Sequence, residues 1–158
     1  MNKKIKTDEK KLEREIGVAP TYDMVIAYLE SLGKTAEYLS IDLETETNEE
    51  LQVTYMKCCS LSDRPTWAIS IPFIKGNGER YFNPDQELDI MQKLQILLAT
   101  DIPKIFQNGQ FDIGVLEIVY KMKVNNLLID TMCGQHVLLP ELPKDLGTLC
   151  SIYTDQPY

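Results

Sequence analysis

The sequence predicts an α/β protein whose mixed sheet starts as a three-stranded meander and continues with alternating helices and strands, flanked by helices. Two observations support this fold class. Segments rich in strand-forming residues, 38–44, 51–59 and 66–73, follow one another with only the turn-like linkers TETNEE and SDRP between them. Helical and extended patterns then alternate from residue 84 onward.

The first half contains one expected helix and the meander. Residues 21–33 predict a helix that ends at Gly33, because glycine suits a helix C-terminus. Its apolar stripe consists of Val25, Ile26, Leu29 and Leu32. In the third strand the side chains that share one face are those of Trp67, Ile69, Ile71 and Phe73.

The second half begins with a helix-start signature. Asn83 can cap a helix whose first position is Pro84, and the expected buried stripe is Leu88, Met91, Leu94 and Leu98. The later elements are a strand at 104–107, a helix at 110–122, a strand at 127–130, a helix at 132–138, and a turn and helix in PELPKDLGTL. Before all of these, the charge-rich residues 1–20 predict a solvated leader, frayed or helical, and 21–158 one domain.

Composition limits the possible functions. A net charge of −8 and a pI near 4.7 argue against a protein that coats nucleic acid electrostatically, but not against an enzyme whose acids bind cations. No apolar run is long enough to span a membrane, and the N-terminal lysines precede no hydrophobic core. Four cysteines without a CxxC pair predict reduced thiols, and together these features predict a cytoplasmic protein.

The strand at 38–44 carries two acids on one face. Leu39, Ile41 and Leu43 point to one side, so Asp42 and Glu44 share the other. In a central strand such acids are partly buried and repel each other unless something compensates. One interpretation is an edge strand with a solvated acidic face. The other is a divalent metal site, because hard cations prefer carboxylate oxygens.

A third acid lies where an apolar residue is expected. Asp112 falls on the same helical stripe as Leu116 and Val119, and Asn108 ends the preceding strand. An aspartate in a first helical turn also suits the helix dipole. If the acids of strand and helix converge, they could hold two cations about 4 Å apart, a geometry that promotes phosphodiester hydrolysis.

Two motifs resemble those of the DEDD-type 3′–5′ exonucleases, which have a ribonuclease H-like fold. IDLE matches the first motif of that family, Asp-x-Glu, and QNGQFD matches the second, Asn-x-x-Phe/Tyr-Asp. The ending DTMCGQHVLLPELPKDLGTLCSIYTDQPY resembles the proofreading domain of bacteriophage-type family A DNA polymerases, which are DNA polymerase I-like. The resemblance covers roughly residues 21–158.

The resemblance implies a two-metal site using Mg2+ or Mn2+. Asp42 would bridge both ions, Glu44 would hold the ion that carries the attacking water, and Asp112 would hold the second ion. Thr45 and Asn108 would contact the 3′-terminal nucleotide. The implied reaction is hydrolysis of 3′-terminal phosphodiesters of single-stranded DNA. The implied setting is a bacterial or phage-infected cytoplasm.

The third family motif, Tyr-x3-Asp on a last helix, is absent from the sequence. Tyr153-Thr154-Asp155 has a different spacing in an expected turn, which leaves Asp155 a doubtful ligand. Asp130 is equally doubtful, since it could lie behind the metal ligands or cap the following helix. We therefore expect an N-terminal piece of a polymerase, truncated before its last helix, that works with the remainder of the polymerase chain.

Two alternatives remain open on the sequence alone. The chain could be an inactive or incomplete exonuclease fragment that serves as a binding or docking module. It could also be an RNA-trimming exonuclease of the same fold, because the two active-site motifs do not distinguish DNA from RNA.

Overall fold

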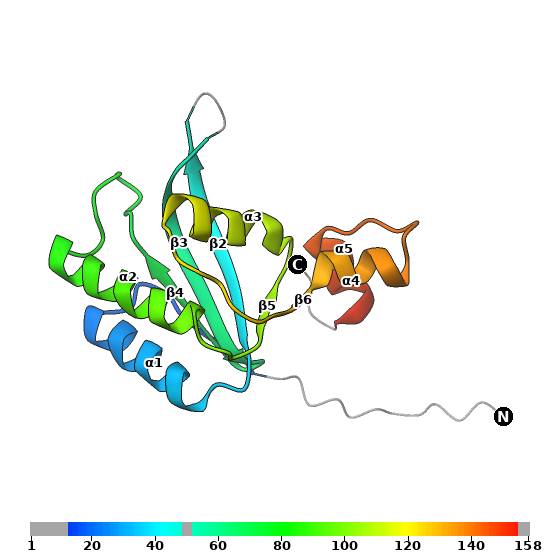
Figure 1. Ribbon diagram of the computed structural model, residues 1–158, viewed down its shortest axis with the longest axis horizontal. Helices are drawn as coiled ribbons and strands as arrows, with labels where there is room; N and C mark the ends of the chain where they lie inside the picture. Colours follow the sequence, from blue (N-terminus) through cyan, green and yellow to red (C-terminus); the bar gives the residue numbers. More distant parts are fainter. Residues whose placement is uncertain (1–12, 49–51, 155–158) are drawn as a thin grey trace.

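The computed structural model describes residues 13–48 and 52–154 and contains a six-stranded mixed sheet of order β1-β4-β3-β2-β5-β6 (Figure 1). The strands are β1 Glu15–Gly17, β2 Leu39–Thr47, β3 Val53–Arg64, β4 Trp67–Pro72, β5 Lys104–Phe106 and β6 Leu127–Asp130. The helices are α1 Tyr22–Thr35, α2 Pro84–Leu98, α3 Gly109–Gly114, the π-helix η1 Val115–Val119, α4 Thr131–Leu138 and α5 Leu146–Tyr153.

The sheet has the expected topology. Strands β2, β3 and β4 form an antiparallel meander, and β5 and β6 add in parallel on the other side of β2. Strand β2 is therefore the strand at which the sheet order reverses. In α/β sheets, ligands bind beyond the carboxyl end of such a strand.

Helices α1, α2 and α3–η1 share one hydrophobic core with one face of β2. That core contains Leu39, Ile41 and Leu43 together with buried residues of all three helical segments. On the opposite face of β2, Asp42 and Glu44 are exposed. The strand is central as expected, but the expectation that its acids are partly buried is wrong, because the side chains of Asp42 and Glu44 are both exposed.

Several element ends differ from the prediction. Helix α1 begins at its Thr21 cap and continues past Gly33 to Thr35. Helix α2 has the expected Asn83 capping box, but Leu88 is 59% exposed. The residues of α2 that face the core are Ile90, Leu94, Leu97 and Leu98. Leu94 and Leu98 of the predicted stripe are thus confirmed as buried, Met91 packs against the core, and only Leu88 was placed incorrectly.

The expected leader contains a strand instead of only solvated chain. Glu15–Gly17 forms β1 and pairs in parallel with β4, covering an edge that would otherwise be unpaired. The linkers TETNEE and SDRP also extend the neighbouring strands, since β2 runs to Thr47 and β3 to Arg64. Residues 1–12 lie outside the described residues.

Helices α4 and α5 lie beside the edge strand β6, away from α1 and α2 (Figure 1). Tyr153 ends α5, so the turn expected there is wrong, and Asp155 lies outside the described residues. All four cysteines are free. Within residues 13–48 and 52–154, no helix has the length and apolar character needed to cross a membrane.

Candidate active site

The candidate site forms where β2 and β5 separate. The two parallel strands pair only at Leu39 and Ser40 of β2, so the later N–H groups on that edge lack a strand partner. The first turn of α3 fills this gap, and the Leu43 N–H donates to Asp112 Oδ1 at 3.0 Å. Asp112 is only 4% exposed. Its carboxylate therefore takes the place of a strand as the acceptor for the Leu43 N–H group.

Burial makes the Asp112 carboxyl a weaker acid than usual. Desolvation raises the pKa of this carboxyl from 3.8 to about 6. The hydrogen bond from Leu43 lowers the pKa, whereas the charges of Asp42 and Asp130 raise it. The folded protein thus holds an acid that ionises near neutrality, beside two other carboxylates.

Asp42 and Glu44 lie next to this buried acid on the exposed face of β2. Partial desolvation still raises the pKa of Asp42, and the charge of Glu44 raises this pKa further. None of the ion pairs in the described part of the chain involves Asp42, Glu44 or Asp112. These three acids thus form no ion pair in that part of the chain, although Lys57, which pairs with Glu46, also interacts with the charge of Glu44.

The carboxylates of the site are chemically suited to a divalent cation, but they are not arranged to hold one together. Carboxylate oxygens are the ligands that hard cations prefer. Yet in residues 13–48 and 52–154 no three Asp, Glu, His or Cys side chains are grouped so that they could hold one ion together. The expected convergence is thus seen only as electrostatic coupling of Asp42 with Glu44 and of Asp42 with Asp112.

Asp130 connects the two helices that border the site. Its carboxylate caps α4 by accepting the N–H groups of Met132 and Cys133, which is one of the two roles that the sequence left open. The same carboxylate also accepts the N–H of Asn108 at 3.0 Å and the N–H of Gly109 at 2.7 Å. These bonds hold the start of α3, and hence the turn that carries Asp112, against the end of β6.

The start of α3 requires particular backbone geometry. Asn108 has φ 59° and ψ 40°, a left-handed conformation that asparagine tolerates better than most residues. Gly109 is buried, and a Cβ at this position would lie 2.5 Å from Cβ of Phe106. Only glycine lets α3 approach β5 this closely, and this approach places Asp112 in the gap beside β2.

The remaining predicted residues are less closely tied to the acids. Thr45 is half-buried and follows a register shift between Glu44 and Thr45, a bulge of the kind that re-aims side chains beside active sites. Asn108 is exposed, with no capping bond from its side chain. Asp155 is not among the described residues, so its role as a ligand stays a prediction.

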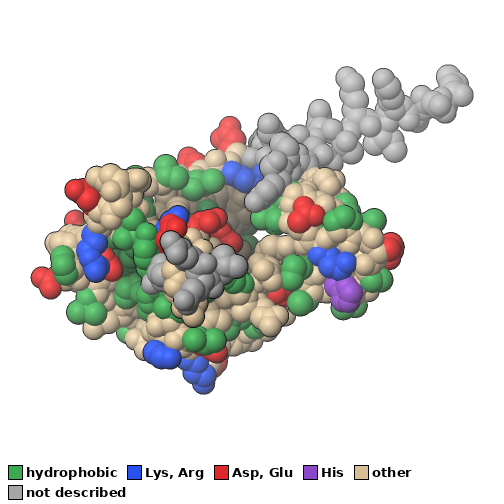
Figure 2. Space-filling view, turned by 90° about the horizontal axis from the view of Figure 1, so that it is seen from above, with side chains coloured by type: hydrophobic (Ala, Val, Ile, Leu, Met, Phe, Trp, Pro, Cys, Tyr) green, Lys and Arg blue, Asp and Glu red, His purple; other side chains and the backbone are tan. Residues whose placement is uncertain are grey.

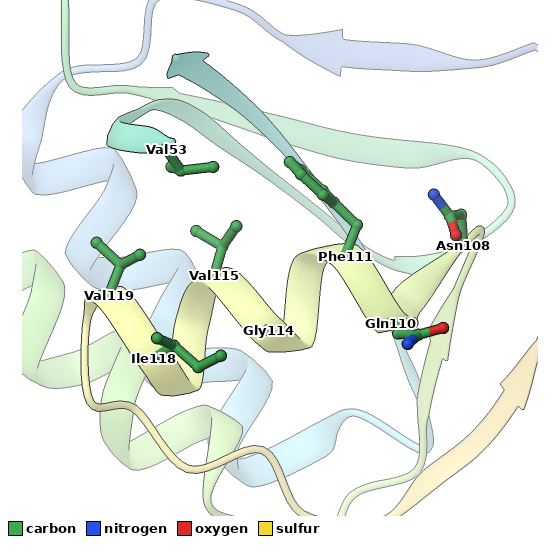
Figure 3. A pocket seen from close by; sticks show the side chains of 8 residues that line it. All are labelled: Val53, Asn108, Gln110, Phe111, Gly114, Val115, Ile118 and Val119. Carbon is green, nitrogen blue, oxygen red and sulfur yellow. The ribbon is translucent and has the colours of Figure 1, made fainter. Parts of the chain in front are cut away.

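One feature that the sequence interpretation missed is a groove beside α3. Phe111 and Gln110 are exposed and line it together with aliphatic residues (Figure 3). The signal was present in QNGQFD, because the neighbour of a buried helical residue must point away from the core. Seen from above, acidic side chains gather near the middle of the molecule, and the surface is hollowed between them and the lobe that contains the histidine (Figure 2).

Comparison with known proteins identifies the family. Residues 18–158 match the model of the 3'-5' exonuclease family of DNA polymerase A type. The chain belongs to this 3'-5' exonuclease family. A DNA polymerase I of Synechocystis sp. is 30% identical over 115 residues, which cover 71% of this chain and 11% of the polymerase. The exonuclease chain thus matches only a small part of that polymerase.

Solved structures share the fold of this exonuclease domain at low identity. The catalytic core of RRP6 from Trypanosoma brucei has a TM-score of 0.66 at 16% identity, covering 89% of this chain and 34% of that one. Brucella melitensis NrnC with bound Mg2+ has a TM-score of 0.58 at 19% identity, covering 92% and 63%. Trypanosoma brucei RNase D in complex with RNA U12 has a TM-score of 0.56 at 20% identity, covering 72% and 36%.

Proposed function

We propose that this 3'-5' exonuclease domain removes nucleotides from the 3′ end of single-stranded DNA, as the proofreading domain of a DNA polymerase. Asp42, Glu44 and Asp112 would hold two divalent ions, Mg2+ or Mn2+. The observation that carries the proposal is the buried Asp112 carboxylate, held by Leu43 in the gap beside β2 and coupled to Asp42 without a paired cation.

Bound cations would neutralise the negative charge of the site. Three carboxylates would repel the phosphate of a nucleic acid, and a divalent ion reverses that field. When bound, such ions polarise the phosphate and activate water for an in-line displacement. The Mg2+ in the structure of Brucella NrnC supports this choice of ion for a protein of the same fold. Because the described acids form no ready group of three, metal binding would require some side-chain movement.

The chain's own residues would orient the substrate and the ligands. The Leu43 N–H fixes one oxygen of Asp112, so the carboxylate cannot turn freely. Asp130 fixes the backbone of Asn108, whose exposed amide would contact the terminal nucleotide. Thr45 would contact the same nucleotide from the bulged end of β2. Holding these groups in place before the substrate arrives lowers the entropic part of the barrier.

The similarity to DNA polymerase I supports DNA as substrate and a polymerase chain as partner. A specific observation favours RNA as a second candidate, since RNase D was solved with the RNA U12 and has the same fold. A third possibility is a docking module without activity, supported by the lack of a preformed group of three ligands in the described residues.

Digestion of matched oligonucleotides tests these functions. DNA and RNA of one sequence, each labelled at the 5′ end, would be incubated with the chain and Mn2+. We expect a DNA ladder shortened from the 3′ end, which Asp42→Ala abolishes and Glu141→Ala, an exposed acid far along the sequence, leaves intact. Faster digestion of RNA would favour the trimming function, and no digestion of either strand would favour the docking module.

A further inference from the structure

A cavity of about 600 Å3 lies beside β1, at the opposite edge of the sheet from β6. Its walls come from β1 and the residues just before it, from α1, and from the β3–β4 hairpin. The lining residues are Glu13, Glu15, Tyr28, Arg64, Thr66 and Trp67. Strands β4 and β3 lie between β1 and β2, so this cavity is separate from the candidate active site.

Two aromatic rings form adjoining walls of the cavity. The ring centroids of Tyr28 and Trp67 are 6.3 Å apart, and the ring planes meet at 74°. The indole of Trp67 also lies close to β1, since a Cβ added to Gly17 would come within 3.2 Å of it. Trp67 is therefore held between β1 and the ring of Tyr28. The faces of such rings attract cations, because they carry partial negative charge.

Asp63 fixes the hairpin wall of the cavity. Its Oδ1 accepts the hydroxyl of Tyr28 at 3.0 Å and the Nε–H of Arg64 at 3.0 Å. The side chain of Asp63 is only 11% exposed, so its ion pair with Arg64 is partly shielded from water. The positive charge of Arg64 is thus balanced within the wall and does not give the cavity an excess of positive charge.

The excess charge of the cavity is negative. Glu13 and Glu15 are exposed and line it, and Glu15 is in register with Trp67 in the ladder of β1 and β4. Neither glutamate takes part in an ion pair within residues 13–48 and 52–154. Arg14, which lies between them in sequence, donates from Nε to the carbonyl of Pro65 instead. Two carboxylates therefore stand beside two aromatic rings.

We propose that this cavity binds a small organic cation of the quaternary or alkylated ammonium class. The alkyl groups around the charge would pack on the rings of Tyr28 and Trp67, and Glu13 and Glu15 would balance the charge. A bare metal ion fits less well, because it requires oxygen ligands and gains little from aromatic walls. A nucleotide fits less well too, because the two carboxylates repel phosphate. The proposal does not depend on the proposed nuclease function.

Trp67 is the only tryptophan of the chain, so tryptophan emission reports on this cavity. The probe is choline chloride, which replaces sodium chloride during the titration so that the ionic strength stays constant. The matched uncharged probe is 3,3-dimethylbutanol, which has the shape of choline without its charge. We expect choline to change the emission saturably and the alcohol to bind at least about tenfold more weakly.

Substitutions test the carboxylates and the rings separately. Glu13→Gln and Glu15→Gln remove charge at nearly constant size, and we expect each to weaken choline binding about two- to fivefold. Glu141→Gln, at an exposed acid elsewhere, should leave it unchanged. Tyr28→Phe keeps the ring and Tyr28→Leu removes it, so only the second should weaken binding, by about threefold or more. Ligand-observed NMR of the choline methyl groups measures each affinity independently of the emission.

Equal affinity for choline and the alcohol would overturn the proposal, as would no binding of choline by either method. Full affinity in both Gln variants of the cavity, or an equal loss in Glu141→Gln, would also overturn it. Loss of binding in Asp42→Ala would place the cation at the acids of β2 instead. Selective loss in the Glu13, Glu15 and Tyr28→Leu variants would support the proposal. None of these measurements involves digestion, so they decide this site whether or not the chain is a nuclease.

Discussion

The buried carboxylate of Asp112 accepts a hydrogen bond from the backbone N–H of Leu43, 3.0 Å away and 69 residues earlier in the chain. One bond thus joins the helix that follows β5 to the strand that carries Asp42 and Glu44. It gives the Leu43 N–H group an acceptor where β5 no longer pairs with β2, and it holds a carboxylate close to Asp42. The energetic cost of this arrangement is an ionised group with little access to water.

We expect Asp112→Asn to stabilise the metal-free protein at neutral pH. Asparagine keeps an oxygen that can accept from Leu43 but removes the buried charge. The pKa shift of Asp112 from 3.8 to about 6 corresponds to about 3 kcal/mol, an upper limit for the gain in unfolding free energy. Urea denaturation at pH 7.5 measures it, and a clear loss of stability would show that the carboxylate has a favourable partner we have not identified.

The same shift sets the pH dependence of stability. Because the folded pKa of Asp112 is raised, the folded state binds more protons than the unfolded state between 3.8 and about 6. The contribution of Asp112 is therefore favourable at low pH and is lost as the pH rises through about 6. The free energy of unfolding of the wild type minus that of Asp112→Asn should fall over this window. A flat difference would contradict the raised pKa.

Divalent cations should raise the melting temperature, and Asp42→Ala should abolish the rise. A ligand that binds only the folded state adds about 2.7 kcal/mol to the free energy of unfolding when its concentration is a hundred times its dissociation constant. Calorimetric scans with Mn2+ and with EDTA measure the effect, with Glu141→Ala as the control. An equal rise in Asp42→Ala would show that the ions bind elsewhere.

Asp130→Ala should lower the free energy of unfolding by more than the loss of a helix cap alone would. Asp130 caps α4 and also accepts N–H groups from Asn108 and Gly109, so we expect about 3 kcal/mol of lost stability. The matched control is Asp145→Ala, which removes the cap of α5 alone and should cost about 1 kcal/mol. Urea denaturation compares the two.

If Asp130 positions the substrate-binding turn, Asp130→Ala should also lower the rate of metal-dependent digestion at saturating oligonucleotide, whereas Asp145→Ala should not. Equal losses of stability and of rate in the two variants would show that Asp130 acts only as a helix cap. A rate restored by Asp130→Asn would agree with its role as an acceptor for the N–H groups of α3.

Gly109→Ala and Gly114→Ala should change the free energy of unfolding in opposite directions. A Cβ on Gly109 would meet Phe106 at 2.5 Å, whereas a Cβ on Gly114 has nothing within 4 Å. We expect Gly109→Ala to cost at least about 2 kcal/mol by pushing α3 from β5, and Gly114→Ala to gain up to about 1 kcal/mol from helix propensity. Denaturation curves of the two variants test this, and tolerance of Gly109→Ala would mean that α3 can shift without strain.

Periodicity alone predicted most elements correctly. Alternation placed Leu39, Ile41 and Leu43 on the core face of β2, and Asn83 with Pro84 marked the start of α2. These signals are local, because strand alternation and helix capping involve residues only a few positions apart. The errors of the prediction also arise because these signals are local. Leu88 was expected on the inward stripe of α2, but it is exposed, and Ile90 and Leu97 are buried beside the predicted Leu94 and Leu98.

The sequence by itself determined the order of the elements and the motifs that contain Asp42, Glu44, Asn108 and Asp112. Only the tertiary structure decided that Asp112 is buried against Leu43, that Glu44 joins no group of three ligands in the described chain, and that Asp130 links two helices. These relationships connect residues far apart in sequence. They depend on where parallel strands stop pairing and how closely a helix approaches the sheet, and neither distance is contained in a local pattern of residues.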